Sequence, residues 1–196
     1  MMKWSMILFF LTLLAGKLKA QGPDTLSKME IQGIVHMREE EKMARDIYDS
    51  MYAKWQVNPF GNIRKSEQVH MDRIKELLDE YGIKDPVNET SDKPGVFISN
   101  TIQQFYSESA NSGSKTLIEA LKVGAKIEEL DIADLNNYGK QTTNKRLLAT
   151  YEYLKMASEN HLRAFVRRLR SNGVVYTPII LTKNVFDNII SKDNRE

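Results

Sequence analysis

The chain has 196 residues, of which 41% are hydrophobic and 28% are charged, enough for one globular domain with a substantial core. It contains no cysteine, which excludes a disulfide framework, a lipoprotein anchor and a rubredoxin-type centre. Without the first twenty residues, 25 lysines and arginines stand against 26 acidic residues, and this balance argues against nucleic-acid binding.

The first twenty residues have the layout of a secretory signal peptide. Lys3 precedes an apolar run over Trp4–Ala15, which is too short for a comfortable membrane span. We therefore expect a signal peptide over 1–20, no stable membrane insertion, and a mature protein that is periplasmic or secreted from a bacterial cell. A permanent N-terminal anchor is the alternative, because Lys17 and Lys19 make an untidy cleavage region.

The remaining chain is predicted to be helical, and its four long helices favour an all-α antiparallel four-helix bundle over 21–182. A tail with a short helix follows over 183–196, after an extended or irregular stretch at 174–182, and Thr182 is its expected cap. A loop is expected over 84–95, which contains two prolines. In chain order, the helices are predicted over Leu26–Trp55, Asn62–Tyr81, Asn100–Ser109 (short), Lys115–Asn137 after a Ser114 cap, Asn144–Ser171 and Val185–Ile190 (short).

Each long helix carries polar residues inside the apolar stripe that should face the interior of the bundle. In the first helix, apolar residues recur at steps of three and four from Ile34 to Trp55, and Glu41 interrupts them. The other three stripes are interrupted in the same way. The interrupting residues are Glu67 and His70 in the second helix, Glu128 and Asp131 in the third, and Ser158 and His161 in the fourth.

Burying these acids requires a compensating charge. An unpaired buried carboxylate costs several kcal/mol, and none of the stripes offers a lysine or arginine. Carboxylates and imidazoles are ligands for iron, manganese or zinc. The pattern therefore predicts one or two buried metal ions, iron or manganese, with zinc as a further alternative. The competing interpretation places Glu41, Glu67 and Glu128 on the solvated surface.

Several stretches of the sequence resemble known proteins. Glu41 to Tyr48 is similar to the first-helix motif of rubrerythrins, and Phe60 to His70 is similar to their second-helix Glu-x-x-His segment. Over Met29–Leu181 the chain more closely resembles the ferritin-like family catalogued as domain of unknown function 2202. The stretches that carry this resemblance are Met37–Asp46, Ser66–Asp72, Gly124–Ile132 and Asn160–Phe165. The resemblance implies a ferritin-like four-helix fold, and it brings no settled reaction.

The resemblance to rubrerythrins also implies a role for each polar residue. Glu41 would be a terminal carboxylate ligand, Glu67 would bridge two metal ions, and His70 would complete its side of the centre. Glu128 and His161 would be the ligands from the third and fourth helices.

Two departures from the rubrerythrin pattern bear on the number of ions. Ser158 stands where the fourth-helix motif would have its glutamate, and Ala125 stands where rubrerythrins keep another one. Asp131, one turn beyond Glu128, is the candidate substitute. The centre is therefore expected to be either an asymmetric dinuclear site or a mononuclear one.

Tyr48 lies on the same face of the first helix as Glu41, two turns along, and two interpretations stay open. As a candidate catalytic residue, it would donate its hydroxyl to a ligand carboxylate. As a core aromatic, it would need only some partner for that hydroxyl. His36 is interpreted as a surface or rim residue, and Glu39 and Glu40 as solvated, with Glu40 replacing Glu41 if the register slips by one.

Two hypotheses about function follow from these residues. In the first, the protein is an exported metal-dependent oxidoreductase that reacts with oxygen or peroxide and takes electrons from an external donor or from Fe(II). In the second, it is a non-catalytic extracytoplasmic binding or structural module with a mononuclear or vestigial metal site. A homo-oligomer is compatible with both.

Overall fold

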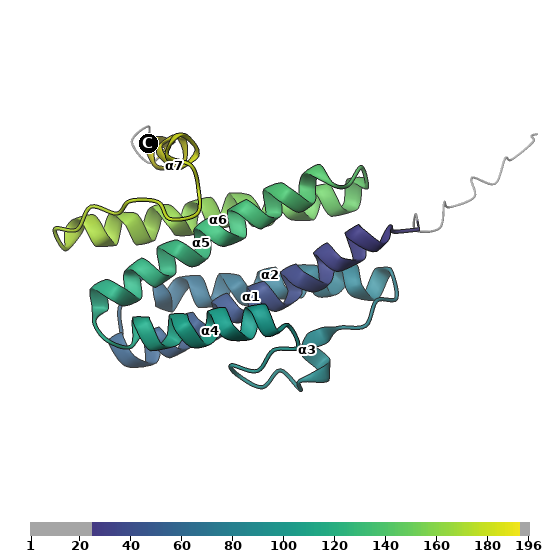
Figure 1. The fold of residues 1–196 in the computed structure, drawn as a ribbon, viewed down its shortest axis with the longest axis horizontal. Helices are drawn as coiled ribbons and strands as arrows, with labels where there is room; N and C mark the ends of the chain where they lie inside the picture. Colours follow the sequence, from purple (N-terminus) through teal and green to yellow (C-terminus); the bar gives the residue numbers. More distant parts are fainter. Residues whose placement is uncertain (1–24, 193–196) are drawn as a thin grey trace, which may run out of the picture.

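A computed structural model describes residues 25–192, whose regular secondary structure is entirely helical (Figure 1). The prediction of an all-α protein is confirmed, while the predicted signal peptide lies outside the described residues. None of the helices over 25–192 has the length and apolarity needed to cross a membrane. The helices are α1 (Lys28–Trp55), α2 (Phe60–Glu80), α3 (Pro86–Glu89), α4 (Asn100–Gly113), α5 (Leu117–Lys140), α6 (Lys145–Ser171) and α7 (Lys183–Ser191).

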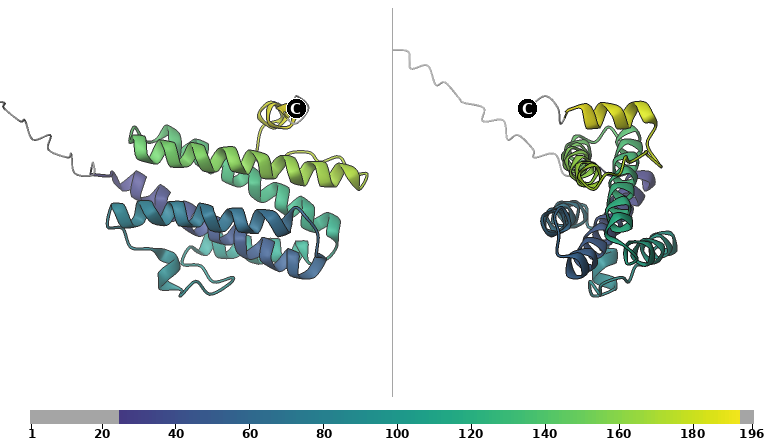
Figure 2. Two further views of the ribbon diagram at one scale, coloured as in Figure 1. Left: turned by 180° about the vertical axis from the view of Figure 1, so that it is seen from behind. Right: turned by 90° about the vertical axis from the view of Figure 1, so that its left-hand side faces the viewer.

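The four long helices lie side by side as two pairs (Figures 1 and 2). α1 packs chiefly on α2, and α5 packs chiefly on α6; smaller contacts of α1 with α5 and of α2 with α6 join the pairs. α4 packs on α1 and α5, so that α1 is covered on its outer side as well. α7 runs across the long helices on the side opposite α4.

The apolar core is divided into two clusters along the bundle. The Phe60 cluster contains Tyr48, Phe60, Leu121 and Phe165 among others, and the Ile74 cluster contains Ile34, Met37, Ile74, Leu77, Leu147 and Leu154 among others. On α1, α2 and α6, the polar residues that interrupt the predicted stripe stand between a stretch belonging to one cluster and a stretch belonging to the other, whereas on α5 they lie at the end of the Phe60 cluster, before Leu135 of the Ile74 cluster. The division of the core therefore coincides with the predicted metal site.

The start of α5 differs from its prediction. α4 continues to Gly113, and Ser114 ends that helix instead of opening the next. Thr116 is the N-cap of α5, because its hydroxyl oxygen accepts the backbone N–H of Glu119 at 3.1 Å. α4 thus extends beyond its predicted end at Ser109, and the Trp55 indole N–H donates to the Gly113 carbonyl at 3.1 Å.

Two other local predictions have mixed outcomes. The segment predicted as a loop over 84–95 contains the short helix α3, which begins after Asp85, whose carboxylate accepts the Val87 N–H. The extended stretch at 174–182 and the Thr182 cap are confirmed, and Thr182 accepts the Val185 N–H. This stretch is held by the buried carboxylate of Glu129, which accepts the Tyr176 hydroxyl at 2.6 Å and three successive backbone N–H groups at 179–181.

Two glycines in α5 provide a matched test of helix packing. A methyl group on Gly124 would clash with the ring of Phe165, whereas a methyl group on Gly139 would meet nothing within 4 Å. Overpacking costs about 1–3 kcal/mol, and replacing a helical glycine with alanine returns up to about 1 kcal/mol. We expect Gly124→Ala to lower the free energy of unfolding and Gly139→Ala to leave it equal or higher, as measured by denaturant titration. Equal stability of both variants would contradict the close α5–α6 approach.

Candidate metal centre

The structure brings five of the predicted ligands together in the interior, where all are buried. They form two groups, in each of which the facing carboxylate and imidazole atoms lie within 4.8 Å of one another. Glu67 belongs to both groups. The first group is Glu41, Glu67 and His70, and the second is Glu67, Glu128 and His161.

The first group is formed by the helix pair α1–α2. Glu67 and His70 are three residues apart on α2, so both side chains point in the same direction. The Nδ1 atom of His70 lies 2.7 Å from Glu67 Oε2 and 3.2 Å from Glu41 Oε2. The other ring nitrogen, Nε2, lies 3.3 Å from the hydroxyl of Ser66, a contact that sequence reasoning missed. The serine four residues before a ligand histidine was the available signal.

The second group joins the two helix pairs. Nδ1 of His161, on α6, lies 3.0 Å from Glu67 Oε1 on α2 and 3.4 Å from Glu128 Oε2 on α5. The two oxygens of Glu67 thus face different histidines. The imidazole rings of His70 and His161 stack with centroids 5.5 Å apart. A carboxylate placed in this way has the geometry of a bridge between two neighbouring cations.

Several donor atoms of these groups have no hydrogen-bond partner, although buried polar atoms are almost always satisfied. The unsatisfied atoms include Glu67 Oε1 and His161 Nδ1, which are close to each other but not aligned for a hydrogen bond. That arrangement suits two lone pairs directed at a common third atom. Glu41 Oε1 and Asp131 Oδ1 are also unsatisfied. The donor set and its orphaned atoms therefore fit a bound cation.

The electrostatics of the group reflect burial and mutual charge. Burial raises the pKa of Glu41 to about 8 and also raises that of Glu128. Burial alone would lower the pKa values of the histidines, but the neighbouring carboxylates raise that of His70 to about 12 and that of His161 to about 10. For Glu67, burial is outweighed by the two imidazolium charges, which lower its pKa. Protons thus occupy the places that a cation would take.

Tyr48 is buried in the core, and its hydroxyl has a carboxylate partner. Its hydroxyl donates to Glu128 Oε1 at 2.7 Å, and the Gly124 carbonyl lies 3.3 Å away. Its ring packs against Phe60 and Phe165 in the Phe60 cluster. The hydrogen bond to Glu128 leaves the other oxygen of that carboxylate directed at His161.

Asp131 and Ser158 occupy the remaining interior positions. The Asp131 carboxylate is buried, and its Oδ2 accepts a hydrogen bond from the Ser158 hydroxyl. Ser158, which departs from the rubrerythrin pattern, therefore faces an acid from the neighbouring helix. Burial, followed by the charges of Glu41 and Glu40, raises the pKa of Asp131 well above its usual range. Asp131 is not a member of either three-residue group. Ala125, the other departure, is fully buried.

The interpretation of Glu39 and Glu40 as solvated residues is wrong, because both are buried. Glu39 accepts the backbone N–H groups of Ile98 at 2.5 Å and of Ser99 at 3.1 Å, which lie at the start of α4. The outer face of α1 is covered by α4 and the segment before it, a long-range contact that helical periodicity does not report. His36 is half-buried, in agreement with its placement at the rim.

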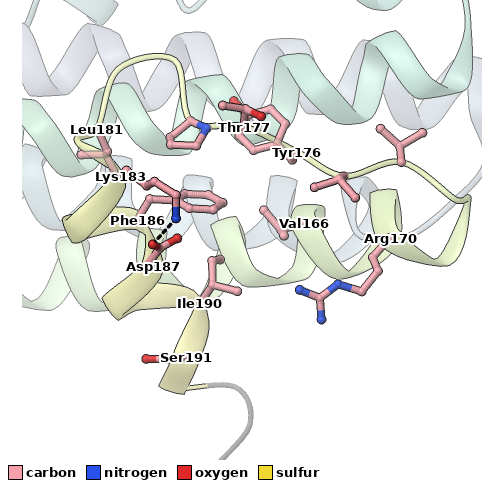
Figure 3. Close-up of a pocket in the computed structure, with 13 residues that line it drawn as sticks. Val166, Arg170, Tyr176, Thr177, Leu181, Lys183, Phe186, Asp187, Ile190 and Ser191 are labelled. Atoms are coloured by element: carbon pink, nitrogen blue, oxygen red, sulfur yellow. Dashed lines mark hydrogen bonds and ion pairs between the residues drawn. The ribbon is translucent and has the colours of Figure 1, made fainter.

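A surface cavity lies elsewhere, in an open groove where the 174–181 segment and α7 meet α6 (Figure 3). Its volume is about 550 Å³, and Val166, Tyr176 and Phe186 form part of its wall. None of the residues that line it belongs to either metal-ligand group. The groove therefore contributes nothing to the candidate metal centre.

Three comparisons place these residues among known proteins. A family model described as an uncharacterized protein domain, DUF2202, matches residues 30–193. Uncharacterized protein MJ0754 of Methanocaldococcus jannaschii is 46% identical over 166 residues, which cover 85% of this chain and 89% of that protein. The crystal structure of hypothetical protein MJ0754 from Methanococcus jannaschii matches with a TM-score of 0.84 at 44% identity, covering 88% of this chain and 98% of that one.

The pKa shifts predict how the stability of the metal-free protein depends on pH. Glu41 binds a proton more tightly when folded, with a pKa of about 8 against 4.5 when unfolded, so its contribution to stability falls from pH 4.5 to 8. His161, at about 10 against 6.5, adds a fall from pH 6.5 to 10. We expect the Tm of metal-free protein to fall between pH 6 and 9, as measured by calorimetry.

Bound metal should change this dependence, because metal ligands bind as deprotonated groups. Adding Mn(II) is expected to raise Tm most at high pH and so to flatten or reverse the slope. Glu41→Gln should have a shallower metal-free slope than the wild type. A metal-free Tm that rises over this range would contradict the proton assignment.

Proposed function

The chain belongs to the DUF2202 family, and we propose that it is an exported ferritin-like metal-binding protein, a di-iron or di-manganese oxidoreductase that reacts with oxygen or peroxide. The proposal depends above all on Glu67, whose two oxygens face different histidines in two three-residue ligand groups. α1 and α5 each provide one carboxylate, from Glu41 and Glu128. α2 and α6 each carry a histidine three residues after a polar residue. This arrangement resembles the di-iron carboxylate bundles.

The chemistry of the ligands limits the choice of metal. Three glutamates and two imidazoles make a hard, mixed oxygen and nitrogen donor set without sulfur, which suits iron and manganese and also admits zinc. Iron or manganese bound there supplies reversible one-electron chemistry, which is what the reduction of oxygen or peroxide requires. The chain contains no cysteine, so electrons would come from an external donor or from Fe(II) itself.

The surrounding residues would orient the ligands and exclude water. Glu41, Glu67 and His70 are almost fully buried, and His161 is the ligand with the largest exposed fraction, at 9%. Such a site favours reactants as small as oxygen or peroxide. Tyr48 holds Glu128 by its hydroxyl, and Ser158 holds Asp131, so both acids have fixed orientations.

One observation favours a second candidate function. Ser158 replaces a carboxylate ligand of the dinuclear pattern, and a mononuclear or vestigial site would then serve a non-catalytic extracytoplasmic module. In that case, the ion would only hold the helix pairs together. The two candidates differ in their expected response to iron and oxygen.

Anaerobic loading with Fe(II) tests the catalytic candidate. We expect two Fe(II) ions to bind per mature chain and ferric absorption to develop on exposure to oxygen or peroxide. Glu67→Gln removes the carboxylate shared by the two groups. Losing a residue that only hydrogen-bonds to a ligand typically costs about 10–100-fold, so the reaction of Glu67→Gln should slow by more than that. Stopped-flow absorption spectroscopy measures the rate, and metal analysis gives the occupancy.

Glu39→Gln is the matched control for Glu67→Gln. Glu39 is a buried glutamate too, but it lies on α1 and accepts backbone N–H groups away from the centre. It should retain both the iron occupancy and the oxygen reaction. Stoichiometric zinc in the purified protein, with no response to iron or oxygen, would instead favour the structural module.

Tyr48→Phe tests the role of the hydrogen bond to Glu128. The substitution retains the ring that packs on Phe60 and Phe165 and removes only the hydroxyl. We expect metal affinity to fall by about 10-fold or more, as is typical when the residue behind a ligand is lost. Competition with a chelator measures the affinity. A changed Tm of the metal-free protein with unchanged affinity would show that the hydroxyl has only a structural role.

A further inference from the structure

A third group of potential metal ligands lies outside the buried centre. It consists of His36 and Glu40 on α1 and Asp134 on α5, and their facing atoms lie within 4.8 Å of one another. His36 and Glu40 are four residues apart and therefore share one face of the helix. The chain has three histidines, and each of them stands in one of the three carboxylate–imidazole groups of the described residues.

The geometry of this group is that of a ligand set around a common point. Nε2 of His36 lies 3.0 Å from Asp134 Oδ2 and 3.2 Å from Glu40 Oε2. Glu40 is 1% exposed, and neither of its carboxylate oxygens has a hydrogen-bond partner. Its approach to His36 is close but not aligned for a hydrogen bond, as in the pair formed by Glu67 and His161. A buried carboxylate left unsatisfied in this way calls for a cation in front of it.

The group differs from the buried centre in its access to solvent. The side chains of His36 and Asp134 are 29% and 28% exposed, whereas that of Glu40 is 2% exposed. One side of the group therefore meets water, and the other side faces the interior. An ion could reach it from solution without any movement of the long helices.

A line of acids connects this group with the buried centre. Asp134, Asp131 and Glu128 follow one another at steps of three along α5, each step about 4.5 Å along the helix axis. The charges of Glu40 and Glu41, adjacent on α1, both act on Asp131. Asp131 also has one buried oxygen without a partner. Asp131 thus stands on α5 between Asp134 of the half-exposed group and Glu128 of the buried centre.

We propose that His36, Glu40 and Asp134 form a third divalent-cation site, an entry site from which ions pass along Asp131 to the buried centre. The entry role depends on the proposed dinuclear function; the ligand set itself does not. A mixed imidazole and carboxylate site of this kind would take Fe(II), Mn(II), Co(II) or Zn(II). It would be the weaker site, because its ligands are partly hydrated.

Anaerobic titration of the metal-free protein with Co(II) tests the site. We expect three ions per chain, of which the most weakly bound is lost in His36→Gln and in Asp134→Asn while the other two remain. Glu119→Gln is the control. Glu119 is a half-exposed acid that pairs with Lys122 and lies on α5, as Asp134 does, so this variant should retain all three ions. Two ions in the wild type, with no change in either variant, would overturn the proposal.

The entry role predicts a rate as well as an occupancy. With less than one equivalent of Co(II), filling of the buried centre should be about tenfold slower in both variants, because each loses a ligand of the entry site, and clefts that concentrate an ion raise association rates by about 10–1000-fold. Stopped-flow absorption follows the filling, and equal loading rates would overturn the entry role. Glu67→Gln should lose the buried ions and keep the outer one. A wild type that binds only the outer ion would refute the dinuclear function without refuting the third site.

Discussion

The dominant constraint on this protein is the burial of acids between four helices. Glu41, Glu67, Glu128 and Asp131 are nearly inaccessible to water, and within the described chain the groups that act most strongly on them are two histidines, Tyr48, Glu40, Ser158 and one another. Four carboxylates carry the charge needed to neutralise two divalent cations. Protonation is the other means of neutralising these acids, and burial favours it by raising the pKa values of Glu41, Glu128 and Asp131. A metal bound as proposed would therefore compete with protons for one cluster.

The pairing of Asp131 with Ser158 gives a physical meaning to the departure from the ligand pattern. A serine in place of a glutamate removes one acid from α6, but α5 provides another that hydrogen-bonds to that serine. A buried carboxylate is thus present on α5 beside the position on α6 that lacks one. Asp131 is also affected by the charge of Glu40, which belongs to the half-exposed group of His36, Glu40 and Asp134. An acid on α5 instead of α6 therefore places negative charge on the side of the buried centre that faces this group. The same substitution that weakens the dinuclear pattern thus supports a route for ions.

Helical periodicity was sufficient to predict the long helices and to identify the five converging residues, since an inward-facing glutamate breaks an apolar stripe at a recognisable position. It failed for Glu39 and Glu40, which lie off the stripe of α1. The burial of Glu39 depends on α4 and the residues before it, which cover the opposite face of the same helix, whereas Glu40 lies beside Asp134 of α5. Coverage of a second face is a tertiary property that one helix's sequence does not encode. The missed His36–Glu40 pair had a local signal, its spacing of four, but no signal for Asp134.

The distribution of ligands over the helix pairs separates the two candidate functions. Glu41, Glu67 and His70 belong to α1 and α2, which already pack extensively on each other, so an ion there adds little to their association. Glu67, Glu128 and His161 span both pairs, whose direct contacts are smaller. A structural staple would need only the second ion. The first group would then be redundant, yet it has an equally converged set of donors and an orphaned Glu41 oxygen. A complete first group therefore favours the proposed reaction at two ions over the structural module.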